Sequence, residues 1–474
     1  MHLTLMGAIL LPLCVLWFPR PERLLALVFF CGIFHAATPV VIGSLGLPPA
    51  VPPASMFVLY VAVQIALGAP FEGARSVLRT LEPQIAAVGY GLISAVTMPR
   101  LFSRALQVWP QKEGIIAGTV ALMPGPGNMT QGLYLLITGV MLAAAALFLA
   151  RREADLRRLL DAYLWSGVAA IAFAFWQMAS KLGGVWFPTD FLYTNPGFAL
   201  LHAQQISFVP RISGSFAEPA DLAYYLSGLI FASGWMVLCG TPARLPRVTL
   251  IGGVLAMLIS TSTTGLVVLA AGAGACVPIA LLRAGSVVGR RIVRIGLPLV
   301  LALVLAGGVA VTLKPSIGRS LALVYSSTLD KQQSTSFEDR TTKDLDALAT
   351  AGPTWGMGVG WGSSRSSSLL PGLVANLGIW GTALLVWFGA RLLLLVRRAR
   401  HTPALEGGGD VGDRWAIEGC FAACLGTLVA ALISSPAVIN LDFYLLLAIL
   451  VAASVRVSVL DRLVLRQEAG ALPA

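Results

Sequence analysis

Long apolar stretches of about 17–25 residues recur along the whole chain, and they limit its possible folds more than any other feature. A helix of about 20 residues crosses a hydrocarbon layer ~30 Å thick. Of the 474 residues, 57% are hydrophobic and 12% are charged, against roughly 25% charged in a soluble domain. The sequence therefore predicts an all-α, polytopic integral membrane protein, with residues 1–474 forming a single transmembrane domain.

These stretches predict about 12–13 transmembrane helices. A helix in lipid is apolar on all sides, so hydrophobic periodicity does not indicate which face is buried. The candidate spans are 3–18, 24–43, 54–68, 84–99, 131–150, 161–180, 219–240, 248–261, 264–282, 295–313, 371–396, 415–434 and 441–455.

The basic residues are unevenly distributed between the two sides of the predicted membrane. Of the 33 lysines and arginines, twice as many fall in one set of alternate loops as in the other. The positive-inside rule identifies the richer side as cytoplasmic. The formal charge of +11 is thus explained by topology, and nucleic acid is not expected as a partner. The richer side includes Arg151, Arg152, Arg157, Arg158, Arg283, Arg290, Arg291, Arg294, Arg397, Arg398 and Arg400.

The opposite, outer side carries three long segments, at 99–130, 181–218 and 314–370. Connections of this length are uncommon unless they serve a function. The second and third segments are also the richest in unusual polar residues. We therefore expect 181–218 and 314–370 to be extracytoplasmic loops that carry the active site.

The second outer loop ends with the residues RISGSFAE, from Arg211 to Glu218, and then enters an apolar helix. Pro219 suits the first helical position, and Asp221 complements the positive end of the helix. On this interpretation Asp221 serves only the helix. Arg211 is harder to explain, because a charge at the membrane boundary usually has a partner or a ligand. A helix N-terminus beside an arginine is suited to bind a phosphate or a diphosphate.

The third outer loop contains a polar stretch that is predicted to form a short helix ending at about Ala351. Ser336 and Asp339 fit a capping box at its start, and this would explain Asp339 without catalysis. Asp344 and Asp346 stand two residues apart, so on a helix they point about 200° apart and cannot share a metal ion. We assign this pair to a solvated face.

A glycine run follows at 356–362. Its spacing is wrong for a nucleotide-binding loop, and no strand precedes it. We expect these glycines to let the backbone pack closely, or approach a ligand, at the rim of the membrane.

The six cysteines lie within or at the edge of apolar spans. Because no cysteine pair occupies an outer loop, we expect no disulfide there. Cys420 and Cys424 are one helical turn apart but have no histidine or carboxylate nearby, which favours packing in the core over metal binding.

Three separated motifs resemble the superfamily of O-antigen ligases and O-antigen or exopolysaccharide polymerases. The first is the RISGSFAEP stretch at 211–219, and the second is Arg340 upstream of the glycine run 356–362. The third is Arg365 followed after fifteen residues by Gly381, which is similar to the Arg-x15-Gly pattern of polymerase outer loops. The order of the motifs and their placement relative to the apolar spans add to the resemblance.

The resemblance implies a GT-C-like helical fold without a nucleotide-sugar site. The donor would be a glycan on a polyprenyl (undecaprenyl) diphosphate, and neither a metal nor another cofactor would be needed. The resemblance also implies that outer-loop arginines hold the diphosphate, and by motif position these are Arg211, Arg340 and Arg365. Guanidinium groups suit this role because they stabilise the charge that develops on a departing diphosphate.

One departure separates this chain from the ligases. Ligases of this superfamily place a histidine eleven residues before the first glycine of a Gly-x-x-Gly pair, and the corresponding residue here is Ser367. This favours a polymerase and leaves the general base to be assigned. Glu218 is the first candidate, because its carboxylate follows Arg211 by seven residues, and Asp339 is the second. His202 is a third, although a loop histidine is more often only solvated or packed.

We therefore expect a polysaccharide polymerase in the bacterial inner membrane, with its active site facing the periplasm. It would transfer a glycan from the polyprenyl diphosphate to a hydroxyl of another lipid-linked repeat unit, in membrane lipid and beside a flippase and a chain-length regulator. The nearest alternative is an O-antigen ligase that transfers the glycan to lipid A core. The alternative from another class is a lipid-linked oligosaccharide transporter or flippase, although transporters usually carry charges or broken helices in mid-span.

Overall fold

In the part of the chain that the structure describes, six helices are long and apolar enough to cross a membrane. The computed structural model describes residues 2–43, 45–111, 118–197, 205–206, 209–282, 287–296, 335–402, 411–435 and 440–470. The six are α5 (Pro126–Leu149), α6 (Leu156–Gly183), α8 (Pro219–Cys239), α15 (Leu369–Arg400), α17 (Val411–Ser434) and α18 (Leu441–Gly470). They coincide with six of the candidate spans, so the prediction of an all-α protein with membrane-spanning helices is supported in this coarser form.

The other helices are shorter or more polar. They are α1 (Leu5–Leu16), α2 (Pro21–Gly32), α3 (Val51–Ala66), α4 (Ala74–Leu101), α7 (Thr189–Leu192), α9 (Leu245–Ile259), α10 (Thr263–Leu282), α11 (Val287–Arg291), the π-helix η1 (Ile292–Gly296) and α14 (Thr335–Ala349). Most of the candidate span 295–313 lies outside the described residues.

The candidate span 24–43 is wrong in its second half. Helix α2 ends at Gly32, and the chain then forms the strand β2 (Val40–Ile42). This strand pairs antiparallel with β1 (His2–Leu3) and β3 (Leu45–Gly46), with Val41 opposite His2 and Gly46. The apolar run therefore continues through a change of backbone conformation that hydropathy cannot detect.

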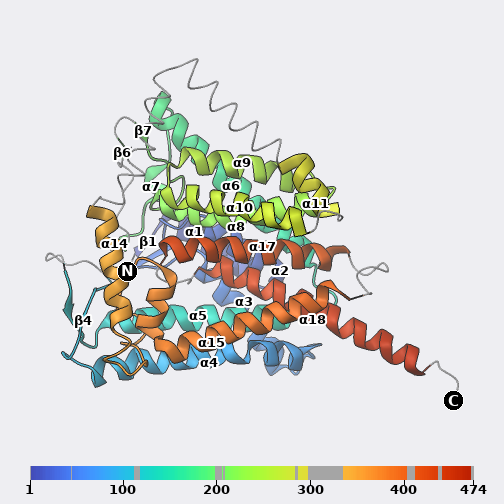
Figure 1. The fold of residues 1–474 in the computed structure, drawn as a ribbon, viewed down its shortest axis with the longest axis horizontal. Helices are drawn as coiled ribbons and strands as arrows, with labels where there is room; N and C mark the ends of the chain where they lie inside the picture. The colour runs from blue at the N-terminus through green and yellow to red at the C-terminus, as the bar shows by residue number, and fades with distance from the viewer. Residues whose placement is uncertain are drawn as a thin grey trace.

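The short strands and the polar helices collect at one end of the helical bundle. Figure 1 shows α7, α14, β4 (Gln107–Val108), β6 (Gln205–Ile206) and β7 (Val209–Pro210) on the side of the N-terminus, opposite the C-terminus. Strand β4 pairs with β5 (Val120–Ala121), and β6 pairs with β7. We call this the loop-rich end. The described parts of the three predicted outer segments thus lie together.

Several arginines of the predicted cytoplasmic side form contacts between helices away from the loop-rich end. Arg456 lies 3.3 Å from the carboxylate of Asp413 and donates to the carbonyl of Ala154 at 2.8 Å. Arg400 pairs with Glu418 at 2.7 Å. These contacts tie α15, α17 and α18 to the segment before α6, so the arginine-rich connections meet at one end of the bundle.

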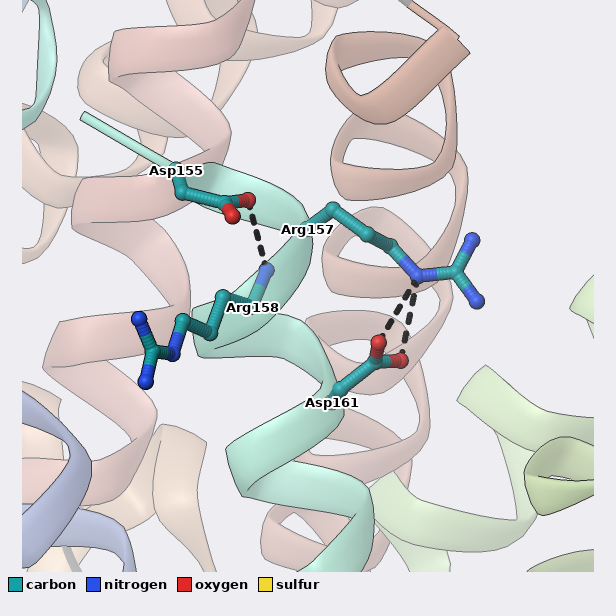
Figure 2. A network of polar contacts seen from close by, with 4 residues as sticks. All are labelled: Asp155, Arg157, Arg158 and Asp161. Atoms are coloured by element: carbon teal, nitrogen blue, oxygen red, sulfur yellow. Dashed lines mark hydrogen bonds and ion pairs between the residues drawn. The ribbon is translucent and has the colours of Figure 1, made fainter. Parts of the chain in front are cut away.

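Helix α6 begins in a polar network at this arginine-rich end (Figure 2). Asp155 is the N-cap residue, and its carboxylate accepts a hydrogen bond from the backbone N–H of Arg158 at 2.9 Å. Arg157 donates from Nε to both carboxylate oxygens of Asp161, at 3.0 and 3.2 Å. The cap satisfies an N–H group that has no partner within the helix, and so fixes where α6 starts.

Helices α8 and α17 pack closely through small residues. A Cβ added to Gly228 would lie 2.5 Å from the hydroxyl of Thr427, and one added to Gly426 would lie 2.6 Å from the carbonyl of Ser227. Small residues allow helices in lipid to approach and gain contact area. Cys420 is fully buried on α17, and this confirms the prediction that it packs in the core.

Candidate functional site

Gln177 holds the second outer loop in place. It lies on α6, near the loop-rich end. The side-chain carbonyl of Gln177 accepts hydrogen bonds from the backbone N–H of Ser213 at 2.8 Å and of Gly214 at 2.9 Å. Its amide donates to the hydroxyl of Tyr193 at 2.8 Å, and that hydroxyl donates to the carbonyl of Gly214 at 2.6 Å. Gly214 has φ +61°, and a Cβ there would meet the backbone of Ala174 at 3.3 Å. The loop is therefore pressed onto α6.

Two further contacts fix the ends of this clamped turn. Lys181, also on α6, donates from Nζ to the carbonyl of Arg211 at 2.7 Å. The hydroxyl of Ser215 donates to the carbonyl of Ile33 at 2.6 Å, just beyond the end of α2. The backbone of Arg211 and the entry into α8 are thus held by groups from α6 and α2.

Replacing Gln177 by Ala is expected to destabilise the protein. The N–H groups of Ser213 and Gly214 would lose their acceptor, at a cost of about 1–3 kcal/mol for each buried group. The measurement is the melting temperature of the purified protein in detergent. The matched control is Gln64→Ala on α3, whose side chain bonds to no residue in the described part of the chain. Equal melting temperatures for the two variants would contradict the clamp.

In the third outer loop, the backbone before Arg365 is held in a similar way by Asn376. This residue lies on α15, and its side-chain carbonyl accepts from the N–H groups of Ser363 and Ser364, both at 3.1 Å. The N–H of Arg365 itself donates to the carbonyl of Trp109 at 2.9 Å. The first outer segment and α15 together fix the position of Arg365.

The backbone after Arg365 is held by Asp344, and this corrects the assignment of Asp344 to a solvated face, whereas Asp346 is exposed as expected. Asp344 accepts from the N–H groups of Ser367 and Ser368 at 2.7 and 3.1 Å, and from the hydroxyl of Ser368 at 2.6 Å. Asp346 accepts from the indole N–H of Trp109 at 2.9 Å. Both carboxylates join α14 to neighbouring segments. Asp344 bonds to the backbone and the hydroxyl of Ser368, the N-cap residue of α15.

The glycine run 356–362 packs against a kink in α15. Gly378 has φ +68° inside this helix, and a Cβ there would lie 2.2 Å from the carbonyl of Gly356. Gly358 has φ +81°, and a Cβ there would lie 2.5 Å from the backbone nitrogen of Gly378. No side chain fits at either position. The prediction that these glycines allow close backbone packing is confirmed.

Helix α14 carries two predicted site residues, Asp339 and Arg340, and both are exposed. Arg340 donates to the hydroxyl of Ser434 at 3.4 Å, which places it beside the end of α17. Asp339 forms no hydrogen bond or ion pair with the residues that the structure describes. The side chain of Ser336 and all of His202 lie outside the described residues, so the capping box and the third candidate base are not described.

Three arginines from separate segments lie within electrostatic range of the carboxyl group of Glu218. The charges of Arg365, Arg211 and Arg340 each lower the pKa of Glu218. Burial is nevertheless the largest influence, and together with the charge of Asp221 it raises the pKa of Glu218 above its ordinary value. We call Arg211, Glu218, Arg340 and Arg365 the arginine–glutamate cluster. The charges of three predicted site residues thus reach Glu218, whereas Asp339 is not among the groups that act on it.

Arg211 is the least exposed arginine of the cluster. Its side chain is half-buried, whereas Arg340 and Arg365 are exposed. Burial lowers the pKa of Arg211, the charge of Glu218 raises it, and the charge of Arg340 lowers it. With Lys181 beside it, the cluster carries more positive than negative charge. Such a group can bind an anion with several charged oxygens.

Glu218 occupies the N-cap position of α8, but its carboxylate does not cap the helix. The residue has extended backbone angles and its side chain forms no capping hydrogen bond. Pro219 takes the first helical position, as predicted, and Asp221 lies in the first turn. The carboxylate of Asp221 also lies 3.6 Å from Nδ1 of His35, so it does not serve the helix alone.

The sequence interpretation missed Gln177, Asn376 and His35. Gln177 and Asn376 are polar residues within apolar spans, and such residues are rarely without a partner or a function. That signal was present in the sequence. His35 carried the same signal, because it lies within the candidate span 24–43, but its contact with Asp221 joins residues far apart in the chain.

An apolar cavity of about 250 Å³ lies between α4, α15, α17 and α18. Almost all of its lining is hydrophobic, including Leu373, Phe388 and Leu447. Leu369 also lines it, four residues after Arg365. The cavity therefore lies within the helical bundle and includes the first residue of α15 in its lining.

The chain matches no protein-family model and no curated protein.

Proposed function

We propose that this protein is a polysaccharide polymerase of the bacterial inner membrane. It transfers a glycan from a polyprenyl diphosphate donor to a hydroxyl of another lipid-linked repeat unit, at the periplasmic face. The observation that carries the proposal is the arginine–glutamate cluster. Three guanidinium groups and one partly buried carboxyl gather at the N-terminal end of α8. This combination suits a reaction in which a diphosphate leaves while a hydroxyl loses its proton.

The arginines bind the diphosphate and stabilise its charge as it leaves. The bond between the anomeric carbon and the diphosphate oxygen breaks, and its electron pair stays on the diphosphate. Guanidinium groups aimed at that developing charge favour the transition state. The positive end of the α8 dipole adds to this effect.

Glu218 acts as the general base. The acceptor hydroxyl attacks the anomeric carbon, and its proton passes to the carboxylate of Glu218. Because the carboxylate does not cap α8, it is available for this task. Its raised pKa also makes it a better proton acceptor than an ordinary glutamate.

The apolar cavity supports a lipid-linked donor. An isoprenoid chain needs a hydrophobic surface, and the cavity provides one whose lining includes Leu369 at the start of α15. The arginine–glutamate cluster offers charges to the headgroup, and the cavity offers contacts to the tail. Polar head and apolar tail are thereby accommodated side by side.

Position 367 favours the polymerase over the ligase. The ligase pattern requires a histidine there, whereas here the backbone of Ser367 is bonded to Asp344 at the start of α15. A role in capping explains this position without proton transfer. The transporter alternative is less favoured, because the predicted site gathers its charges at one end of the bundle.

Purified protein is expected to lengthen lipid-linked repeat units without added metal or lipid A. The measurement is the size distribution of the products on a gel, which should rise in steps of one whole repeat unit. The control is the same protein with repeat units from which the diphosphate has been removed. Transfer of a single glycan to lipid A core, with no lengthening, would show a ligase. Movement of intact donor across a vesicle membrane without bond formation would show a transporter.

A further inference from the structure

A second apolar cavity, of about 350 Å³, lies between α4 and α5. Its lining on α4 extends from Leu81 to Leu92, which is about 16 Å along the helix axis. Three of its apolar lining residues, Ile85, Leu136 and Val140, are 47%, 40% and 39% exposed, so the cavity opens at the surface of the bundle. Because α5 is long and apolar enough to cross a membrane, this opening faces the hydrocarbon of the bilayer.

We call this cavity the outer cavity, and the cavity of about 250 Å³ described above the inner cavity. The inner cavity opens to lipid between a different pair of helices, because Leu393 on α15 and Leu425 and Leu428 on α17 line it and are exposed. Gln84 and Val88 of α4 line both cavities, so these two side chains form the wall between them. The bundle therefore has two adjoining apolar cavities with separate openings to lipid.

The wall between the two cavities is closed. Gln84 is buried, and Val88 packs against α5 at Gly139, where an added Cβ would lie 2.9 Å from Cγ2 of Val88. Only a glycine allows the two helices to approach so closely at this point. Two hydrocarbon chains can therefore lie on either side of the wall, each in its own cavity.

The helices that form the outer cavity also contact the loop that carries Arg365. Asn128, in the first turn of α5, donates to the carbonyl of Trp361 at 2.9 Å and to the hydroxyl of Ser363 at 2.7 Å. The N–H of Trp361 donates to the hydroxyl of Ser94 on α4 at 3.3 Å. Both helices thus lead from the outer cavity to this loop, so a lipid with its tail between them would present its headgroup beside the loop.

We propose that the outer cavity binds the polyprenyl tail of the acceptor, the second lipid-linked repeat unit, while the inner cavity binds the tail of the donor. The proposal rests on the proposed function. A polymerase of this kind joins two lipid-linked units, so two hydrocarbon tails have to be accommodated at the same time. Two apolar cavities that open separately to lipid meet this requirement.

The chemistry of the two substrates decides which tail each cavity takes. The donor reacts at the carbon bonded to its diphosphate, so its headgroup has to reach the arginines. Two helices of the inner cavity end beside these residues: α15 starts at Leu369, four residues after Arg365, and Ser434 at the end of α17 accepts from Arg340. The acceptor reacts through a hydroxyl of its glycan and keeps its own diphosphate intact. Its headgroup therefore needs no residue of the arginine–glutamate cluster, and α4 and α5 carry none.

Two glycines allow each cavity to be filled separately. Gly89 lines the outer cavity and Gly389 lines the inner cavity, and a Cβ added at either position meets no atom of a neighbouring residue within 4 Å. Gly89→Trp is expected to raise KM for the acceptor at least tenfold, with kcat and KM for the donor little changed. Loss of contact with two methylene groups already corresponds to about a factor of ten in affinity. Gly389→Trp should raise KM for the donor instead. Gly274→Trp on α10 is the matched control, because Gly274 has the same clearance and lines neither cavity.

The measurement uses repeat units that can play only one role. A unit with a methylated acceptor hydroxyl acts only as donor. A unit with a methylene group in place of the oxygen between sugar and diphosphate acts only as acceptor. The same acceptor is also supplied without its tail. The wild-type protein should show a KM for the tail-less acceptor at least tenfold above that for the tailed one, and Gly89→Trp should lose this difference.

A second test does not depend on turnover. Native mass spectrometry of the purified protein in detergent counts the molecules of polyprenyl phosphate that it binds. The wild-type protein and Gly274→Trp should bind two, whereas Gly89→Trp and Gly389→Trp should each bind one. The melting temperature of each variant shows whether it is folded.

The outcomes separate the acceptor site from the function. An unchanged KM for the tailed acceptor in a folded Gly89→Trp would overturn the acceptor site, while an active wild type leaves the polymerase standing. Binding of a single polyprenyl phosphate by the wild type would do the same. So would a bilayer phospholipid that is lost from Gly89→Trp with no change in KM for the acceptor. A wild-type protein that forms no product from lipid-linked units would overturn the proposed function, and the assignment of the acceptor tail with it.

Discussion

Glu218→Gln is expected to abolish polymer formation while the protein still folds and inserts. The substitution keeps the shape of the side chain and removes only its ability to take a proton. Glu218 is the carboxyl on which the charges of three arginines act. The measurement is product formation from lipid-linked repeat units, with the melting temperature of the purified variant as the test of folding.

Two other variants set the comparison for this prediction. Ser367→Ala should keep most of the activity, because only the backbone of Ser367 is bonded to Asp344. Asp339→Asn tests the second candidate base, which is exposed and does not act on Glu218. Full activity in Glu218→Gln together with a loss in Asp339→Asn would transfer the role of base to Asp339.

The same base predicts the direction of the pH dependence. In the proposed mechanism Glu218 reacts as the carboxylate, so activity should fall as the pH drops through its pKa. Burial and Asp221 raise that pKa above the ordinary value of 4.5, and the three arginines limit the rise. The loss should therefore begin at a higher pH than for an exposed glutamate. Asp221→Asn removes one of the raising influences and should shift the acid limb to lower pH.

Arg211→Ala, Arg340→Ala and Arg365→Ala are each expected to lower activity by at least tenfold. A hydrogen bond to a charged group contributes about 1.5–3 kcal/mol, and about 1.4 kcal/mol corresponds to a factor of ten. Arg211 should show the largest loss, because it is half-buried and its charge is screened less by water. Initial rates at saturating acceptor measure the effect.

Conservative and remote variants complete this test. Arg→Lys at each position should recover little activity, since an ammonium group cannot form the two parallel hydrogen bonds of a guanidinium. Arg100→Ala is the matched control: this exposed arginine ends α4, and its guanidinium donates to the carbonyl of Val96 within its own helix. An Arg100→Ala variant that loses as much activity as Arg211→Ala would show that only the overall positive charge matters.

The fold was predictable where a long apolar run is also a helix. The start of α8 is an example, because Pro219 fixes the first helical turn. The run from 24 to 43 shows the limit. Its residues stay apolar after Gly32, yet the segment leaves the helix and forms β2. Hydropathy shows that side chains prefer lipid or a protein core. It does not show where the backbone changes from helix to strand.

The candidate site was predictable only in part, for a related reason. The motif positions led to Arg211, Arg340 and Arg365, whose charges all act on Glu218. The groups that hold them in place were not found. Asp344 was assigned to a solvated face. Its three hydrogen bonds go to residues more than twenty positions away, and a local sequence pattern does not reveal them. Patterns in one sequence describe neighbours along the chain. The hydrogen bonds that hold the site join helices and loops that are far apart in the chain.

The two side-chain amide clamps couple the loops that carry Arg211 and Arg365 to two long apolar helices. Gln177 on α6 holds the turn that follows Arg211, and Asn376 on α15 holds the turn that precedes Arg365. The separation of these two arginines therefore follows the separation and tilt of two long apolar helices. Helices adjust their tilt to the thickness of the surrounding hydrocarbon. Lipids of different chain length should therefore change the spacing of Arg211 and Arg365 through these helices.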